Sequence, residues 1–309
     1  MIRLFTHTDL DGIGCAILAK LGFGNNIEIS YCDYNDINEK VTACIQENNE
    51  DTIYITDISV SKELALEIEK SELRSKFCLL DHHPTALELN QFDWCHVKID
   101  DESTGLKTCG TELFYKYLVD KGYLKEKAGY KRFVGIIRDY DTWRWAELGD
   151  KGQISKQVND LFQIYGREEF VQRFSYSVSL GIFPDFDEID KELLWIRQKE
   201  IDAYVEEKSL QMTIHKICGQ TCGIVFADRF VSELGNRLCI LHPEIDFVAM
   251  IDISDGCISY RTVRDDLDLG NDIAKPFGGG GHAKAAGSQF PSFMQENFIK
   301  MLFGEYMEE

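Results

Sequence analysis

The first half of the chain alternates between short apolar runs and longer segments whose apolar residues recur at helical spacing. Runs such as Ile53-Tyr54-Ile55 and Cys78-Leu79-Leu80 contain no alternating polar positions, which is typical of parallel strands that are buried on both faces. The pattern predicts strands over 2–6, 27–31, 52–56, 77–80 and 96–99, and helices over 11–21, 36–48, 60–70, 107–121 and 126–138. This alternation indicates an α/β domain with a doubly wound parallel sheet.

The second half contains a long charged helical segment, followed by a smaller set of strands and helices. Residues 150–185 are predicted to be helical and irregular, while 187–210 form a charged helix with one apolar side, as in a connector between domains. Strands are then predicted over 212–217, 223–227, 246–252 and 257–263, with a helix over 231–241, a glycine-rich turn and a final helix. We therefore expect an N-terminal domain over 1–185, a helical linker over 186–210 and a smaller α/β domain over 211–309.

Composition limits the classes of partner and compartment. A chain of 309 residues exceeds the usual size of one core, which also favours two domains. The net charge of −20 argues against binding along duplex nucleic acid and favours a short or small phosphate compound held by metals and a few basic residues. The ten cysteines are scattered, the start is strand-like rather than a signal peptide, and no apolar run approaches about 18 residues. We expect a cytoplasmic protein with free thiols and no membrane partner.

Aspartate and histidine residues gather in four short clusters, each after an apolar run. The members are His7, Asp9 and Asp11, then Asp57, then His82 and His83, and finally Asp139. Carboxylates with a few imidazoles suit Mn²⁺ or Mg²⁺ better than a thiolate-type zinc site does. Because the carboxyl ends of parallel strands meet at one edge of a sheet, the clusters indicate a single dinuclear metal site. Asp141 competes with Asp139 for the fourth position, since both end the same apolar segment.

Individual members of these clusters have other interpretations. Asp57 alone is typical of a residue that caps the next helix, and an Asp-rich turn can cap the first helix. Of the adjacent His82 and His83, one imidazole can bind metal while the other donates to a phosphate, with Asp81 fixing a tautomer. A pair of surface histidines before a turn proline is the alternative at that position.

A glycine-rich segment near the C-terminus is a candidate anion site. It consists of Gly278, Gly279, Gly280 and Gly281, followed by His282 and Lys284. Bare backbone N–H groups before a helix start favour an anion, and the two side chains add donors. Arg261, on the strand predicted over 257–263, can clamp a phosphate bidentately. The alternative for this segment is a plain flexible loop. If it instead binds the same substrate as the Asp and His clusters, the joint site is expected in a cleft between two domains.

Taken in order, these motifs resemble the DHH phosphoesterase superfamily with a C-terminal DHHA1 domain. The resemblance covers nearly the whole chain, and the first and fourth clusters are similar to those of the nanoRNase (oligoribonuclease) NrnB-like branch. It implies two Mn²⁺ ions, with Mg²⁺ as the alternative, held by His7, Asp9, Asp11, Asp57, His82 and Asp139. It also implies substrate phosphate contacts at His83, Arg261 and His282.

The mechanism that this resemblance implies is attack of a metal-activated water on phosphorus, with Asp57 bridging the metals and His82 and His83 completing the catalytic group. The first hypothesis is a Mn²⁺-dependent phosphodiesterase that releases nucleoside monophosphates from RNA of two to five nucleotides. Its partners would be short single-stranded oligoribonucleotides, and a homodimer is compatible with it. Tyr140 and Trp143 can stack a base, or can equally pack in the core.

Two further hypotheses come from other classes of function. The second is a phosphatase or phosphodiesterase for a smaller compound, such as pAp, a linear or cyclic dinucleotide, pyrophosphate or polyphosphate. The third is a non-catalytic nucleotide-binding module, which the complete set of candidate ligands disfavours.

Overall fold

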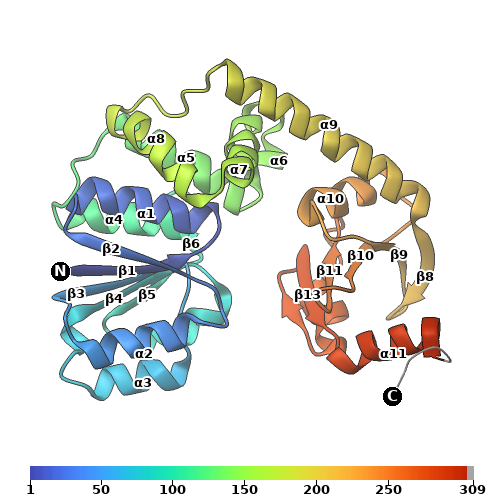
Figure 1. Cartoon of the computed structure of the whole chain (residues 1–309), viewed down its shortest axis with the longest axis horizontal. Coiled ribbons are helices and arrows are strands. Elements are labelled where there is room, and N and C mark those ends of the chain that lie inside the picture. Colours follow the sequence, from blue (N-terminus) through green and yellow to red (C-terminus); the bar gives the residue numbers. More distant parts are fainter. Residues whose placement is uncertain (305–309) are drawn as a thin grey trace. The chain divides into compact units, whose positions relative to one another are not determined.

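The computed structural model describes residues 1–304 and divides into two compact units (Figure 1). The first unit covers Met1–Leu194 and the second begins at Trp195. The division falls inside helix α9 (Glu188–Gln211), in the region where the sequence predicts a connecting helix. None of the helices within residues 1–304 has both the length and the apolar character needed to cross a membrane.

The first unit contains a five-stranded sheet in the order β2-β1-β3-β4-β5, with every neighbouring pair parallel. The strands are β1 (Ile2–His7), β2 (Ile27–Cys32), β3 (Thr52–Thr56), β4 (Phe77–Asp81) and β5 (Cys95–Val97). Smaller elements follow in η1 (Arg74–Lys76), η2 (Pro84–Gln91), β6 (Asp100–Asp101), β7 (Leu106–Lys107), α6 (Arg144–Glu147) and η3 (Gly149–Lys151). The parallel sheet confirms the predicted fold class.

Helices cover both faces of this sheet. Figure 1 shows α1 (Leu10–Phe23) and α4 (Gly110–Asp120) on one face, and α2 (Ile37–Glu47) and α3 (Lys62–Lys70) on the other. Side chains of neighbouring strand residues point to opposite faces, so on β1 Leu4 enters the core under α1 while Phe5 enters the core under α2. The α1 side is extended by α5 (Ala128–Asp141), α7 (Gln153–Tyr165) and α8 (Arg167–Leu180).

The strand order reverses between β1 and β3. The chain passes from β1 to β2 on one side, and from β3 to β4 on the other. In open parallel sheets, ligands bind outside the carboxyl ends of the strands at such a reversal. His7 is the last residue of β1 and Asp57 directly follows β3, so two of the predicted clusters flank this point.

The second unit is built on a six-stranded sheet in the order β12-β13-β11-β10-β9-β8. Its elements are β8 (Thr213–Ile217), β9 (Gln220–Phe226), α10 (Val231–Leu241), β10 (Phe247–Asp252), β11 (Cys257–Arg261), η4 (Leu269–Ala274), η5 (Lys275–Phe277), β12 (Gly280–Gly281), β13 (Ala285–Gln289) and α11 (Ser292–Phe303). Only β9 and β10 are parallel neighbours in this sheet. One core lies between the sheet and α9 and α10, and a second lies against η4.

The glycine-rich turn differs from the sequence prediction. It leads into β12, which pairs antiparallel with β13, and not into a helix. Glycine is needed for this close pairing, because a Cβ at Gly279 would lie 2.0 Å from the carbonyl oxygen of Gly287, and one at Gly281 2.6 Å from Cα of Ala286. The expectation of a helix dipole behind this turn is therefore wrong: the small residues after His282 form a strand that packs against β11.

Candidate metal centre

The site lies at the carboxyl ends of β1, β3 and β4, where the backbone turns sharply. Asp57 follows β3 with a φ of 59°, in the left-handed region that Asp and Asn tolerate better than most residues. Its N–H donates to the carbonyl oxygen of Leu80 on the neighbouring strand at 3.0 Å. At the end of β1, the Asp9 side chain accepts the N–H of Gly12 at 3.1 Å and caps α1. Helix capping, the alternative interpretation of this turn, is thus present together with the clustering.

Two groups of candidate ligands converge on Asp57. On one side, His7 Nδ1 lies 2.9 Å from Asp9 Oδ2 and 3.8 Å from Asp57 Oδ2. On the other side, His82 Nε2 lies 3.2 Å from Asp57 Oδ1. The two oxygens of one carboxylate therefore face different groups.

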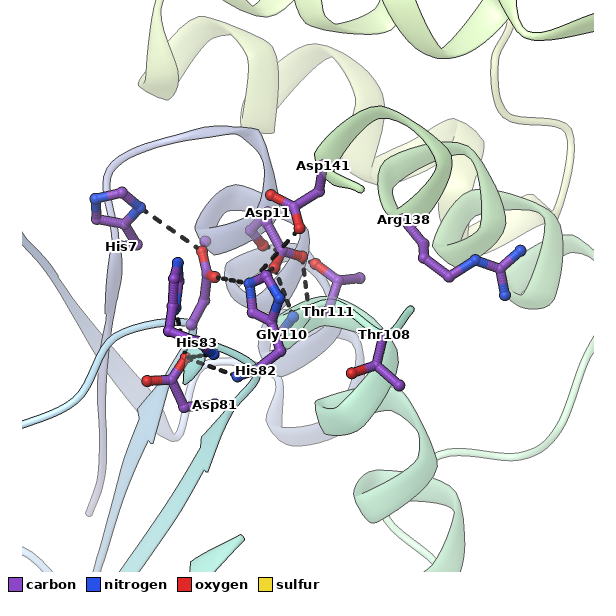
Figure 2. A network of polar contacts seen from close by, with 12 residues as sticks. His7, Asp11, Asp81, His82, His83, Thr108, Gly110, Thr111, Arg138 and Asp141 are labelled. Atoms are coloured by element: carbon purple, nitrogen blue, oxygen red, sulfur yellow. Dashed lines mark hydrogen bonds and ion pairs between the residues drawn. The ribbon is translucent and has the colours of Figure 1, made fainter. Parts of the chain in front are cut away.

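The second group is completed by two further carboxylates. His82 Nε2 lies 3.7 Å from Asp11 Oδ2 and 3.6 Å from Asp141 Oδ2. Figure 2 shows Asp141 turned toward Asp11 and His82, while Arg138 on the same helix points away. The ligand atoms of Asp11, His82 and Asp141 lie within 4.8 Å of one another, as do those of His7, Asp9 and Asp57.

The structure places Asp141 in this cluster and leaves Asp139, the other residue considered for this position, outside it. Oδ1 of Asp139 accepts from the guanidinium groups of Arg138 at 3.2 Å and Arg144 at 3.0 Å. The physical reason is helical geometry: α5 continues to Asp141, and residues two apart on a helix point in different directions. The prediction that this helix ends at residue 138 hid the difference between Asp139 and Asp141.

The start of α4 holds Asp11 in place, and the sequence analysis did not identify it. The N–H of Gly110 donates to Asp11 Oδ2 at 2.5 Å, and the N–H of Thr111 donates to Oδ1 at 2.8 Å. A Cβ on Gly110 would lie 2.5 Å from Cβ of Asp57, so only glycine fits between the two carboxylates. A glycine in the first turn of a predicted helix was the available signal.

His83 is oriented by the buried carboxylate of Asp81. Oδ1 of Asp81 lies 2.7 Å from His83 Nδ1 and also accepts the N–H of His82 at 2.7 Å, while Oδ2 accepts from the Ser59 hydroxyl at 2.5 Å. The other ring nitrogen, His83 Nε2, lies 3.4 Å from the hydroxyl of Tyr34. Of the candidate catalytic residues, His83 therefore has one nitrogen fixed by the fold and one that faces the exposed rim.

The protonation behaviour of the cluster reflects its excess of negative charge. Burial, followed by the charges of Asp11 and Asp9, raises the pKa of Asp57 well above its ordinary value, and the same causes raise the pKa of Asp141. Asp9 behaves differently: desolvation favours its neutral form, but the interactions with His7 and with the Gly12 N–H outweigh it and lower the pKa of Asp9 to about 2. Protons or cations must therefore compensate the carboxylates around Asp57.

These residues fit divalent metal ions. Within residues 1–304, Asp57 Oδ2 is buried and has no hydrogen-bond partner. An oxygen-rich donor set with two imidazoles suits Mn²⁺ or Mg²⁺, and a bound cation would satisfy the orphaned oxygen. His7, Asp9 and Asp57 could hold one ion, and Asp11, Asp57, His82 and Asp141 the other.

The aromatic residues beside the fourth cluster pack with one another. Tyr140 stacks on Trp145 with ring centroids 6.4 Å apart, and Trp143 meets the same ring edge-on at 5.1 Å. Tyr140 also packs against the core of the first unit, whereas Trp143 is half-buried beside it.

In the second unit, Arg261 is a half-buried cation on β11. Its guanidinium donates to the carbonyl oxygen of Tyr260 at 2.9 Å and to the hydroxyl of Ser232 at 3.0 Å. Burial lowers the pKa of Arg261, and none of the ion pairs in residues 1–304 supplies it with a carboxylate. A Cβ at Gly235 of α10 would lie 2.5 Å from its Cγ, so glycine makes room for this side chain.

The other predicted anion-binding residues lie on the same unit. Lys284 contacts Asp265 Oδ1 at 2.8 Å and the carbonyl oxygen of Arg264, so its charge is already compensated. His282 and Gly280 are exposed, and a Cβ at Gly280 would meet no neighbour. Of these residues, Arg261 is the clearest candidate for binding an anion, because its positive charge is half-buried and no ion pair within residues 1–304 compensates it.

Comparison with known proteins gives one family. Residues 1–137 match the DHH family, N-terminal domain. The oligoribonuclease NrnB of Bacillus subtilis (strain 168) is 35% identical over 311 residues, covering 98% of this chain and 76% of that protein. Two solved structures share the fold at 14% identity: the pGpG-specific phosphodiesterase PggH from Vibrio cholerae (TM-score 0.52, 98% and 97% covered) and the exonuclease RecJ bound to manganese (TM-score 0.54, 99% and 90% covered).

Proposed function

This chain belongs to the DHH family, in its NrnB-like branch, and we propose that it is a manganese-dependent phosphodiesterase that hydrolyses RNA of two to five nucleotides to nucleoside monophosphates. It is a metal-dependent phosphoesterase; the metal, the substrate length and the residue roles are the proposed part. The observation that carries the proposal is the position of Asp57, whose two oxygens face two separate groups of candidate ligands.

Two divalent ions, when bound, would polarise the phosphoryl oxygens and lower the pKa of an attacking water. Asp57 would be shared between the two sites, because its two oxygens face different groups, and His7 and Asp9 would act on one side. On the other side, Asp141 is the proposed ligand beside His82 and Asp11, because its carboxylate, and not that of Asp139, lies in this group. The N-terminus of α4 orients Asp11, since two backbone N–H groups donate to its carboxylate.

His83 is proposed to contact the phosphate and not a metal. Asp81 holds its Nδ1, which fixes the ring and leaves Nε2 as the nitrogen directed away from the fold. A protonated Nε2 can donate to a phosphoryl oxygen or to the oxygen of the departing nucleoside. Ser59 and the backbone N–H groups supply the remaining donors to Asp81, so the carboxylate stays in one position during turnover.

The second unit is proposed to hold a substrate phosphate. Arg261 is a half-buried cation that has no carboxylate partner among residues 1–304, and a phosphate would supply a negative charge there. Gly279, Gly280 and Gly281, with His282 and Lys284, are the other groups of this unit that we propose for phosphate binding.

The alternative retains the metal site but changes the substrate. A phosphatase or phosphodiesterase for pAp, a cyclic dinucleotide or pyrophosphate would use the same carboxylates and imidazoles. The test is a panel of pApA, five- and 24-nucleotide RNA, pAp, c-di-AMP and pyrophosphate, each incubated with Mn²⁺ and with the Asp57→Asn variant as background. The proposal expects pApA and the five-nucleotide RNA to be cleaved fastest. Faster turnover of pAp or pyrophosphate would favour the alternative.

A further inference from the structure

An exposed tyrosine stands at the rim of the candidate metal centre. Tyr34 follows β2, and its ring centroid lies 5.4 Å from that of His7 and 6.3 Å from that of His83. The contact with His83 is edge-on, with an angle of 88° between the rings. Tyr34 therefore touches imidazoles from both sides of the cluster although it is not one of the candidate ligands.

The turn that carries Tyr34 is fixed by its own hydrogen bonds. Asp33 Oδ1 accepts the N–H of Asn35 at 2.7 Å, and Asp36 Oδ1 accepts the N–H of Asp33 at 2.9 Å. Lys40 then bonds both Asp36 Oδ2 at 2.6 Å and the carbonyl oxygen of Tyr31 at 2.7 Å. The backbone on either side of Tyr34 is thus held, and the ring reaches the imidazoles of His7 and His83.

Most of the surface of Tyr34 has no protein cover, since the residue is 59% exposed. A ring that served only to pack the rim would be expected to bury more of its surface. An exposed aromatic face beside a phosphate-cleaving centre is the arrangement that stacks a nucleobase, and stacking tolerates any base because each one has a π-face. The neighbouring His83 contact brings this face next to the proposed phosphate position.

We infer that Tyr34 is a stacking platform for the base of a nucleoside attached to the cleaved phosphate. This inference rests on the proposed function, and it assigns substrate recognition to the loop between β2 and α2. The platform would select nucleotide esters over pyrophosphate or base-free phosphodiesters, and it would do so without preference for base sequence. The hydroxyl of Tyr34 would be secondary, because stacking requires only the ring.

The test compares Tyr34→Ala with Tyr34→Phe, which retains the ring and loses only the hydroxyl. Tyr176→Ala is the matched control, since Tyr176 is 71% exposed in the same unit and lies on α8. Substrates are pApA and its two analogues that each lack one base. Loss of one stacked base, worth about 1–3 kcal/mol, corresponds to a rise in KM of about 5- to 150-fold.

We expect Tyr34→Ala to raise KM for pApA by at least about fivefold with little change in kcat, while Tyr34→Phe and Tyr176→Ala stay within twofold of wild type. One of the two base-lacking analogues should be cleaved equally well by wild type and Tyr34→Ala, which identifies the stacked nucleoside. Equal losses in Phe and Ala, or a KM defect that persists with both analogues, would overturn the platform. Wild-type protein that leaves pApA intact would overturn the proposed function as well.

Discussion

Replacing Asp57 by asparagine should make the metal-free protein more stable and at the same time weaken its binding of metal. Burial, followed by the charges of Asp11 and Asp9, raises the pKa of Asp57 well above its ordinary value. The folded protein therefore retains a proton on Asp57 that the unfolded chain releases above about pH 4. As a result, the free energy of unfolding falls as the pH rises from about 4 toward the raised pKa. Asparagine has no proton to lose, so Asp57→Asn removes this penalty and should be more stable than wild type without metal.

The size of the gain depends on how far the pKa is raised. Each pKa unit corresponds to about 1.4 kcal/mol, and about 1 kcal/mol shifts the melting temperature of a unit of this size by about 2–4 °C. Asparagine is chosen because it also tolerates the φ of 59° at this position. Asp57→Ala would add a backbone penalty of about 1–2 kcal/mol in the same region, and would conceal the electrostatic gain.

Metal should reverse the order of the two proteins. A ligand at a hundredfold excess over its Kd stabilises the folded state by about 2.7 kcal/mol, or about 5–10 °C here. Wild type should show this rise with Mn²⁺, and Asp57→Asn should lose most of it together with hydrolysis. The measurement is thermal unfolding in EDTA and in Mn²⁺ at pH 4, 5.5 and 7. In EDTA, the higher melting temperature expected of Asp57→Asn should disappear near pH 4 and increase toward pH 7. A variant that is less stable than wild type at pH 7 in EDTA would refute the reasoning. So would a variant that Mn²⁺ stabilises as much as it stabilises wild type.

Three further outcomes are expected. Asp141→Asn should lower kcat at least a hundredfold, while Asp139→Asn should stay within tenfold of wild type, and equal losses in a turnover assay would contradict the revised ligand set. Gly110→Ala should lower both stability and activity, because its Cβ would lie 2.5 Å from Cβ of Asp57. Gly135→Ala is the control: a Cβ there meets no neighbour within 4 Å, so it should raise the stability of α5 by about 0.5–1 kcal/mol, as measured by circular dichroism melts. After EDTA treatment and dialysis, Mn²⁺ should restore hydrolysis better than Zn²⁺ or Ca²⁺, and full activity in excess EDTA would exclude a dinuclear centre.

The sequence predicted the parallel sheet well because its strands leave an unusually simple signal. β3 and β4 are buried on both faces, so their apolar runs need no alternation, and the helices between them have one apolar side. The glycine-rich segment failed for the opposite reason. Glycines before a helix and glycines in a close β-pairing have the same composition, and only the partner strand β13 distinguishes them.

Candidate ligands that directly follow strands could be predicted from the sequence. Those on a helix could not, because which side chain faces the site depends on where the helix ends. His7, Asp57 and His82 lie at strand ends, so the parallel sheet alone brings them together. The choice between Asp139 and Asp141 required the end point of α5, which sequence patterns locate only to within a few residues. Tyr34 also left no signal, because a single tyrosine in a polar turn has no periodic pattern.

The contacts of the individual carboxylates indicate where the fold has left negative charge for cations to compensate. Asp11 receives two N–H groups from the start of α4, and Asp9 is compensated by His7 and the first turn of α1. Within the part of the chain that the structure describes, Asp57 has no such donor on Oδ2, although both groups of candidate ligands converge on it. Protein donors thus stabilise Asp9 and Asp11, whereas Oδ2 of Asp57 is left for a cation to compensate. Changes at Asp9 or Asp11 should therefore affect both stability and cation binding, whereas a change at Asp57 can improve stability while removing cation binding.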